Sequence, residues 1–456
     1  MSTDIEDSKE ILQEPDEIEV PDGGYGWVVL VAFFLFNFCT WGANAGYAIY
    51  LTEYLDQNVF PGGTKLDYSA VGGIAFGAGL LFAPFITWFS HKFTLHLTIA
   101  LGIVFQGAAL LLAAFSKKLW QIYLTQGLLI SFGLAFLFIP AMTLIPQWFR
   151  KKRSVASGIG TGGSGLGGIV FNLGMQRIVE ARGVKWALIA QCIICSSLST
   201  IALILTRTRR SAVFKDEKPK TLIVARQVFS KAGTWLLCGW ISFTMLGYVI
   251  LLYSLSAFTT SLGYSAKQGS VVSCMVSVGF LFGRPTVGHL ADLFGPITVG
   301  IIVHLIVAIF AWAMWIPCSN LATAIIFALI VGSLMGTIWP TVASIAARVV
   351  GLKKLDVTLG SMWVFLAIFG MPAPVIGFKL RSNANDGKAY VNTAIFAGFG
   401  YLGASLCLLL LRGYIIARDR SSAKSDSMDQ DELDVDVSFK EFVRGLTTWN
   451  VPKGKV

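Results

Sequence analysis

The sequence predicts an all-α membrane protein of twelve transmembrane helices, arranged as two pseudo-symmetric six-helix halves. Of its 456 residues, 55% are hydrophobic and only 14% are charged, and the mean hydropathy is +0.67. Such a composition suits lipid better than water as the solvent. Apolar runs of about 20 residues, the length that crosses a bilayer, recur along the chain. Short motifs of the first half also return about 200 residues later, which indicates an internal repeat.

The expected spans follow one another through short connections, except in the middle of the chain. We place them at residues 26–51, 68–90, 93–115, 119–145, 155–178, 186–206, 234–261, 270–290, 297–316, 321–346, 357–380 and 393–414. The predicted domains are an acidic N-terminal tail 1–24, a first half 25–206, a basic central loop 207–233, a second half 234–415 and a polar C-terminal tail 416–456. The acids of the last tail suggest a solvated, regulatory segment.

The net charge of +10 comes from basic residues in short bursts between apolar stretches. This distribution indicates membrane topology rather than nucleic acid binding. Lys and Arg are in excess in the loops on the side of both termini, which places the N- and C-termini in the cytoplasm. The polar N-terminus lacks the features of a cleavable signal peptide, so the first span is expected to direct insertion. We expect the plasma membrane, with the vacuolar membrane as the alternative.

The seven Cys are scattered through apolar segments, and the one close pair, Cys192 and Cys195, has no second pair to complete a metal site. We therefore predict no metal and no cofactor. The expected partners are membrane lipid and a small organic solute, with one chain as the transport unit.

Short sequence motifs of the first half recur at corresponding positions of the second half. Gly46-Tyr47 at the end of the first span recurs as Gly247-Tyr248 in the seventh, and Pro140 of the fourth span has a counterpart in Pro340 of the tenth. The segment 66–70 before the second span is similar to the segment 262–266 before the eighth. Each pair alone is weak, but the nearly constant offset indicates a duplication.

Two motifs flank the spans of the first half. Asp22, Gly23, Gly24, Gly26 and Trp27 form an acidic residue, a glycine turn and an interfacial aromatic at the entrance to the first span. Between the fourth and fifth spans, Trp-Phe-Arg-Lys-Lys-Arg-Ser-Val-Ala-Ser-Gly at 148–158 joins aromatics to a basic cluster and a small-residue helix. Taken singly, the first is only a helix entrance with an aromatic belt, and the second only a positive-inside loop.

At these two places together, the motifs resemble the paired signatures of the monocarboxylate porter family within the major facilitator superfamily. The residues of the two motifs are most similar to those of the yeast branch of this family, the monocarboxylate transporter homologues. The resemblance extends over essentially all twelve spans. It implies the major facilitator fold and a secondary carrier that works by alternating access. Substrates across that family range from short monocarboxylates to aromatic amino acids, hormones and vitamins, so the resemblance names no single solute.

Residues 288–295 (Gly-His-Leu-Ala-Asp-Leu-Phe-Gly) resemble the gating motif of the superfamily, with Leu293 in place of the usual basic residue. Gly288 and Asp292 are the gating residues that this resemblance implies, and Arg150 and Arg153 belong to the basic loop on the same side. Asp292 can accept hydrogen bonds from the start of a neighbouring helix in the outward-open state. The corresponding loop of the first half, 90–92, has no acid, so we expect the second half to supply most of the inner gate.

The glycine-rich run 158–168 in the fifth span is similar to a phosphate-binding loop only in composition, because no strand precedes it and no Lys-Ser/Thr follows. Small residues on several faces favour close helix packing instead.

Arg284, in the Gly-Arg-Pro of the eighth span, is the one cation deep within the predicted spans. A charge inside a membrane is costly and therefore indicates function. The family resemblance agrees, since an Arg-Pro pair at this point binds anionic substrate in characterised members. The alternative is that Arg284 extends toward the cytoplasm or pairs with Asp292.

In the first span, Asn37, Trp41, Asn44 and Tyr47 recur at spacings of three and four, which places them on one helical face. Such a face can line a wet cavity that holds substrate. Asn in a membrane helix is also used to bond a neighbouring helix, so both roles stay open for each residue.

Three more aromatic residues are candidates for substrate contact: Tyr248, Trp339 and Trp363. Aromatics that face lipid are common, so these candidates rest on position alone. His304 in the ninth span suggests a proton relay, but a packing role with a local hydrogen bond is favoured because this span is usually peripheral in the fold.

These features favour a secondary transporter for a small organic solute, anionic and either monocarboxylate-like or a bulkier aromatic or vitamin-like molecule. The alternative is a nutrient sensor on the same fold that does not transport, whose usual mark is a large added cytoplasmic domain. An enzyme is not expected, because no His, Asp and Glu cluster within the spans.

Coupling to protons is not expected either. Proton-coupled members of the family carry a Lys in the first span and an Asp one turn before the Arg of the eighth, and the matching positions here are Ala45 and Phe280. A buried proton site needs a titratable group whose charge is compensated nearby. Facilitated diffusion of a bulkier or aromatic substrate is therefore favoured over lactate-type proton symport.

Overall fold

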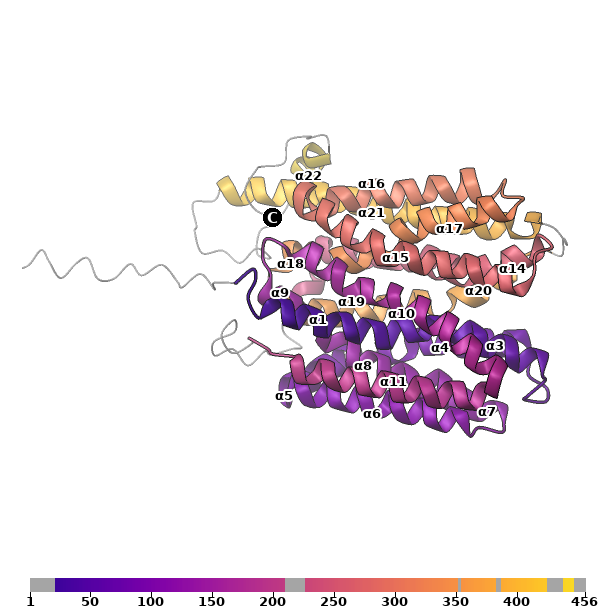
Figure 1. Cartoon of the computed structure of the whole chain (residues 1–456). Helices are drawn as coiled ribbons and strands as arrows, with labels where there is room; N and C mark the ends of the chain where they lie inside the picture. The colour runs from indigo at the N-terminus through magenta and orange to yellow at the C-terminus, as the bar shows by residue number, and fades with distance from the viewer. Residues whose placement is uncertain (1–20, 210–225, 352–353, 383–386, 425–437, 447–456) are drawn as a thin grey trace, which may run out of the picture.

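The computed structural model describes residues 21–209, 226–351, 354–382, 387–424 and 438–446, and within them the regular structure is helical. In Figure 1 the long helices run side by side along one axis, with most of the first half of the chain (indigo to magenta) below most of the second half (salmon to yellow). The start of α1 and the short helix α22 (Phe439–Leu446) lie at the same end of the bundle, which we name the terminal end; the opposite end is the distal end.

The first half consists of six helical segments joined by short turns. In order they are α1 (Gly26–Asn37), η1 (Phe38–Gly42), α2 (Ala43–Ala45) and α3 (Tyr47–Asp56); α4 (Lys65–Leu81) and α5 (Ala83–Lys92); α6 (Leu95–Ala114); α7 (Leu119–Ile122), η2 (Tyr123–Leu129), α8 (Ile130–Met142) and α9 (Ile145–Trp148); α10 (Arg153–Arg182); and α11 (Val184–Leu205).

The second half follows the same plan and adds a short C-terminal helix. Its elements are α14 (Ala232–Ser261); α15 (Ala266–Phe294); α16 (Pro296–Phe310) and η3 (Ala311–Trp315); α17 (Leu321–Met335) and α18 (Ile338–Val350); α19 (Leu355–Gly370) and α20 (Ala373–Leu380); η4 (Gly387–Tyr390) and α21 (Val391–Lys424); and α22 (Phe439–Leu446).

Ten helices in the described chain are long and apolar enough to cross a membrane, and the bent pair α4–α5 makes an eleventh. The remaining long helix, α10, has 30 residues, but its glycines and its charged ends keep its mean hydropathy low. Composition alone therefore does not mark α10 as a span, although it lies among the others in the bundle (Figure 1). With α10 included, the number of long helical segments agrees with the predicted twelve.

The start of the second segment in each half shows where the repeat register lies. The predicted pairing of 66–70 with 262–266 is wrong in register, because 66–70 lie inside α4 whereas 262–265 precede α15. The N-caps Thr64 and Ser265 are the better match. Each forms a capping box with its helix, and they are separated by the same offset of about 200 residues as the other repeat pairs.

The first segment contains a π-helical turn, η1, which departs from the regular hydrogen-bond ladder of an α-helix. Two buried amides from other helices support the carbonyls there. Gln106 Nε2 of α6 donates to Cys39 O at 2.6 Å, and Gln191 Nε2 of α11 donates to Ala43 O at 3.4 Å. Side chains of α6 and α11 thus stabilise the irregular turn that carries Trp41.

The two halves meet most closely where α10 packs against α15. A Cβ added to Gly158 would lie 2.3 Å from Arg284 O, and one added to Gly165 would lie 2.5 Å from Leu281 N. These helices approach closer than any side chain on those two glycines allows. The packing role predicted for the glycine-rich run is therefore confirmed.

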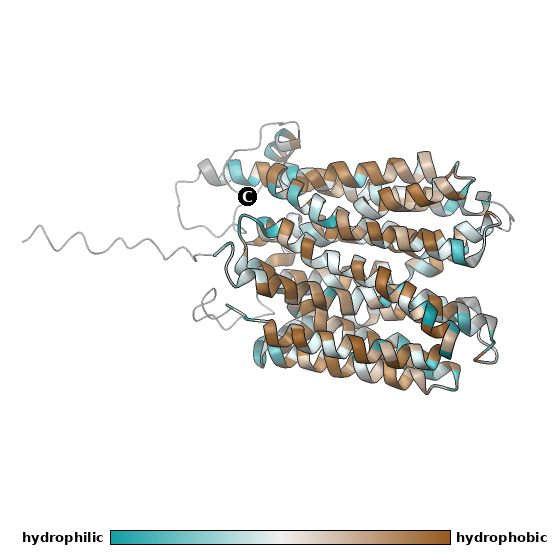
Figure 2. Cartoon of the chain, in the orientation of Figure 1, coloured by the Kyte–Doolittle hydropathy of each residue, from teal (hydrophilic) through white to brown (hydrophobic). Residues whose placement is uncertain are grey.

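Apolar residues cover the length of the helices, and polar residues gather toward the two ends of the bundle (Figure 2). Many large apolar side chains are exposed on the outside of this bundle, for example Phe282, Ile302 and Ile204. A surface of this kind is stable against acyl chains rather than water.

The C-terminal tail contains one short helix among the described residues. Helix α22 packs on α21, where Gly445 lies so close to Gly413 that an added Cβ would meet Gly413 O at 2.3 Å. Its other side chains are exposed or half-buried, for example Phe439 and Val443, so the solvated tail stays a prediction. The tail acids at 429–434 lie outside the described residues.

Candidate functional site

Arg284 lies within α15 at the boundary between the halves, and its side chain is only 4% exposed. Its Nη1 donates to Thr161 O at 2.7 Å and to Ser164 Oγ at 2.6 Å, both on α10. Its Nη2 donates to Tyr248 OH of α14 at 3.3 Å. The alternative in which Arg284 pairs with Asp292 is wrong, because the guanidinium makes these bonds instead.

No buried acid in the described part of the chain balances the charge of Arg284. Among the side chains that the structure describes, the buried Arg, Lys, His, Asp and Glu are Arg284, His304 and Arg418 alone. The Phe280 ring stacks on the guanidinium, with the guanidinium carbon 4.2 Å from the ring centroid. A buried cation compensated only by neutral dipoles and an aromatic face keeps a strong preference for an anion.

Aromatic side chains from four helical segments surround this cation on one side. Trp339 of α18 lies 5.9 Å from the Arg284 guanidinium carbon and 6.1 Å from the centroids of both Tyr248 and Trp363. Trp41 of η1 contacts Trp339 at 5.9 Å between ring centroids. The structure therefore brings Arg284 together with four of the predicted aromatic candidates.

Three neighbours of this cluster are not among the predicted contact residues. Phe138 of α8 contacts the rings of Trp41, Trp339 and Trp363, with centroids 5.4 to 5.6 Å apart. Thr161 and Ser164 supply the oxygens that hold Arg284. The glycine-rich run that contains them was a usable signal, since two hydroxyl residues among glycines are the only polar groups the helix offers there.

Three buried N–H groups at this site have no hydrogen-bond partner among the described residues: Arg284 Nε, Trp41 Nε1 and Trp339 Nε1. Gly336 lies beside Arg284 Nε, where an added Cβ would be 2.8 Å away, so the absence of a side chain there leaves room for the guanidinium. Buried donors without partners favour an acceptor that enters from outside. A carboxylate is such an acceptor, and the surrounding rings suit an apolar body.

The four residues of the predicted polar face of the first span do not share one environment in the structure. Asn37 Nδ2 donates to Phe33 O of its own helix at 2.9 Å, and Tyr47 OH donates to Tyr68 O of α4 at 3.0 Å. Asn44 lines a small cavity of about 30 Å³ inside the first half, together with Gln106 and Gln191 among others. Because the π-helical turn alters the register, only Trp41 of the four predicted residues joins the aromatic cluster.

At the terminal end, Asp292 closes the contact between the halves. Its two carboxylate oxygens accept from Ser154 N at 3.0 Å and Val155 N at 2.8 Å, which are the first free N–H groups of α10. A negative charge at a helix N-terminus is favourable. Gly288, one turn before, packs on Ser154, where an added Cβ would lie 2.3 Å from the Ser154 carbonyl oxygen.

The two signature motifs are in direct contact at the same end. Asp22 Oδ1 accepts from Arg150 N at 2.7 Å and Lys151 N at 2.9 Å. The rings of Trp27 and Phe149 lie 5.3 Å apart in an edge arrangement. Asp22 adopts a φ of 47° and Gly24 a φ of 59°, so the chain turns sharply before α1. The motifs thus join the start of α1 to the loop before α10.

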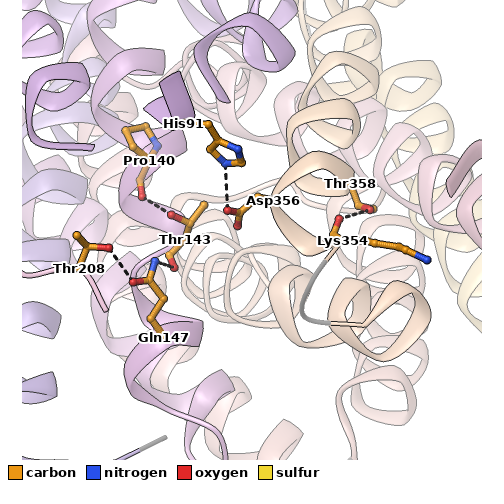
Figure 3. Close-up of polar contacts among 8 residues, drawn as sticks. All are labelled: His91, Pro140, Thr143, Gln147, Thr208, Lys354, Asp356 and Thr358. Atoms are coloured by element: carbon orange, nitrogen blue, oxygen red, sulfur yellow. Dashed lines mark hydrogen bonds and ion pairs between the residues drawn. The ribbon is translucent and has the colours of Figure 1, made fainter. Parts of the chain in front are cut away.

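A second link between the halves joins α5 to α19. His91 Nε2 lies 3.3 Å from Asp356 Oδ2, and the two side chains are only 11% and 16% exposed (Figure 3). Thr143 donates to Pro140 O at 2.9 Å in the adjacent bend between α8 and α9. Asp356, like Asp292, is an acid of the second half that meets the first half at the terminal end, and the expectation that the second half mainly holds the gate stays a prediction.

His304 is buried between α14 and α16. Its Nδ1 lies 2.7 Å from Gly300 O, and its Nε2 lies 3.3 Å from Trp240 Nε1, which donates to it. Both ring nitrogens are thus occupied in a neutral tautomer, as expected for a packing role. In the described part of the chain no group of three or more His, Cys, Asp or Glu is arranged to hold a metal.

Replacing Arg150, Lys151, Lys152 and Arg153 together by Gln is expected to reduce membrane insertion or the maximal rate far more than substrate affinity. These side chains lie at the rim of the bundle, and the backbone N–H groups of Arg150 and Lys151 that donate to Asp22 remain after the substitution. The matched control replaces four cations of the distal loops, Lys117, Lys118, Arg182 and Lys185. Surface labelling and uptake kinetics measure both, and a large change in half-saturation concentration at normal expression would count against the topological role.

Comparison with known proteins gives matches over most of the chain. A family model described as Major Facilitator Superfamily matches residues 29–374. A Saccharomyces cerevisiae protein named probable transporter MCH2 is 64% identical over 431 residues, which are 94% of this chain and 91% of the relative. Another yeast protein, the uncharacterized transporter ESBP6, is 32% identical, and the match covers 87% of this chain but 60% of that relative. The solved structure of the Escherichia coli fucose:proton symporter FucP is similar in fold, with a TM-score of 0.62 and 16% identity over 85% of this chain and 98% of FucP.

Proposed function

Because the chain belongs to the Major Facilitator Superfamily and matches its yeast Mch branch, we propose that it carries a small organic anion across a membrane by alternating access. The observation that supports this proposal is the state of Arg284. It is a buried cation at the boundary between the two halves, without a buried Asp or Glu among the described side chains. Solute sites of such carriers lie at this boundary, near the middle of the bilayer.

The aromatic cluster favours a carboxylate on a planar apolar body over a short acid such as lactate. Trp41, Phe138, Trp339 and Trp363 present large apolar faces next to the cation. Aromatic rings pair well with other rings at centroid distances of about 4.5 to 7 Å. We therefore assign an aromatic monocarboxylate as the substrate class, with the carboxylate at Arg284 and the ring among these side chains.

The experiment compares an acid with its uncharged amide. We expect cells that express the protein to take up phenyllactate, and other aromatic monocarboxylates of a panel, faster than cells without it. Phenyllactamide has the same shape but no charge, so the protein is not expected to accelerate its entry. Equal acceleration of acid and amide, or none for any organic acid, would contradict the proposal.

We also propose that the protein lies in the plasma membrane, with both termini and the loop at 150–153 on the cytoplasmic side. The excess of Lys and Arg at the terminal end supports this orientation. An epitope placed at the C-terminus is expected to bind antibody only after the cells are permeabilised. Antibody binding on intact cells would contradict this orientation.

Uptake is expected not to depend on a proton gradient. Phe280 stacks on Arg284 at the position where the family resemblance places an acid, and Asp292 and His304 are occupied in hydrogen bonds. A proton-coupled site needs a buried group that can take up the proton. Initial uptake of phenyllactate into proteoliposomes should therefore be the same with and without an imposed inward proton gradient.

A known proton symporter in the same lipid serves as the positive control for this gradient. A several-fold stimulation that a protonophore abolishes would refute the expectation and would direct attention to His304 or Asp292.

A further inference from the structure

The glycine-rich run of α10 does more than bring two helices together. It places Thr161 O and Ser164 Oγ against Nη1 of Arg284, at 2.7 and 2.6 Å. Both residues are buried, at 1% and 5% exposure. They belong to the first half, whereas Arg284 belongs to the second, so these two hydrogen bonds cross the boundary that must open in alternating access.

The hydrogen-bond capacity of Arg284 limits where an anion can bind. A guanidinium has five N–H donors in a fixed plane, and a carboxylate binds best to two parallel ones. The edge formed by Nε and Nη2 faces Gly336, whose added Cβ would lie 2.8 Å from Nε and 3.4 Å from Nη2. Gly336 thus lies close to that edge and leaves Nε accessible to a single acceptor atom. The other pair of parallel donors is on Nη1 and Nη2, so a carboxylate bound there by two parallel bonds uses Nη1.

The Nη1 donors, however, are already taken by α10. Ser164 is the partner that can leave at low cost, because its hydroxyl also donates to Thr161 O at 2.9 Å and can keep that bond. The Thr161 carbonyl is fixed in the helix backbone. An entering carboxylate therefore competes with Ser164 for Arg284.

We propose that Ser164 is a positioning residue that clasps Arg284 across the two halves in the empty carrier, and that the substrate carboxylate displaces it. This inference rests on the proposed function for the identity of the competitor, but not for the clasp itself. In this displacement Arg284 loses its hydrogen bond to Ser164 of the first half and gains a hydrogen bond to the substrate carboxylate. The substrate thereby weakens the contact that holds the halves together, which couples binding to rocking.

The clasp is tested without any substrate by a double-mutant cycle on the purified full-length protein. Ser164→Ala is expected to lower the melting temperature by several degrees in the wild-type background and to have no further effect in an Arg284→Ala background. Ser405→Ala is the matched control, because Ser405 is equally buried and its hydroxyl bonds Ile301 O within the second half. Equal effects of Ser164→Ala in both backgrounds would overturn the clasp.

Displacement is tested by binding of phenyllactate to the same proteins. Removing the competitor should lower the half-saturation concentration of Ser164→Ala several-fold, up to roughly tenfold, which is the net worth of one typical hydrogen bond. Ser164→Thr, which keeps the hydroxyl, and Ser405→Ala should bind as wild type. Weaker or unchanged binding by Ser164→Ala, beside normal wild-type binding, would overturn displacement. Absence of phenyllactate binding to wild type would contradict the proposed substrate class, and the stability cycle would still decide on the clasp.

Discussion

Replacing Arg284 by Ala is expected to abolish anion transport while the protein remains inserted and folded. The substitution removes the buried cation but leaves the aromatic cluster around it, so packing is little changed. Loss of one partner of a buried charge pair costs about 2–5 kcal/mol, which corresponds to a loss of affinity of roughly thirtyfold to several thousandfold. Uptake of phenyllactate at equal surface expression measures the effect.

The substitution Arg284→Lys tests whether the charge alone is sufficient for transport. Lys keeps the charge but lacks the planar fork that holds a carboxylate with two bonds, and it cannot reach Thr161, Ser164 and Tyr248 at once. We expect it to restore part of the activity at most. Unchanged uptake by the Ala variant would show that Arg284 does not bind the substrate.

Replacing Gly158 by Ala is expected to impair both stability and transport, although it adds only one methyl group. The new Cβ would lie 2.3 Å from Arg284 O and 3.0 Å from the Cα of Pro285, and these are backbone atoms that cannot move aside alone. Overpacking of this kind costs about 1–3 kcal/mol. It also forces α10 away from α15 at the level of the Arg284 site. The melting temperature should fall by several degrees, and the maximal uptake rate should fall with it.

Gly174→Ala on the same helix is the matched control, because nothing lies within 4 Å of its added Cβ. Ala is favoured over Gly inside a helix by about 0.5–1 kcal/mol, so this variant should be as stable as wild type or slightly more so. If Gly158→Ala melted and transported like Gly174→Ala, close backbone contact at Gly158 would not matter to the carrier.

Hydropathy was sufficient to predict most of the fold. Eleven of the twelve predicted segments are apolar enough to be recognised from composition, while α10 is recognised only by its place between two such segments. The resemblance of residues 288–295 to the gating motif predicted that Asp292 accepts hydrogen bonds from the start of a neighbouring helix, and the structure shows that this helix is α10.

The cation of the candidate site could be found from the sequence for a simple reason. A charge within an apolar run is rare and costly, so Arg284 stands out. The aromatic residues could not be sorted in the same way. Trp339 and Trp363 are 3% and 0% exposed, whereas Trp120 and Trp186 are 58% and 51% exposed, yet all four lie in or beside apolar segments.

Contacts between segments that are distant in the sequence could not be predicted from the sequence pattern. His91 and Asp356 are 265 residues apart and meet only because α5 and α19 lie together at the terminal end. The irregular turn η1 depends on amides from α6 and α11, so the predicted face of Asn37, Asn44 and Tyr47 could not account for it. Local periodicity predicts a regular helix and carries no information on such tertiary support.

The central claim is that the protein exchanges organic anions across the membrane through a site at Arg284, and counterflow in proteoliposomes tests it most directly. Vesicles loaded with unlabelled phenyllactate are diluted into a trace of labelled phenyllactate, without any ion gradient. Wild-type protein should produce a transient accumulation of label, because a carrier returns with substrate from the loaded side. Arg284→Ala and vesicles loaded with phenyllactamide should produce none. Absence of accumulation with the wild type, or the same accumulation with Arg284→Ala, would contradict the claim.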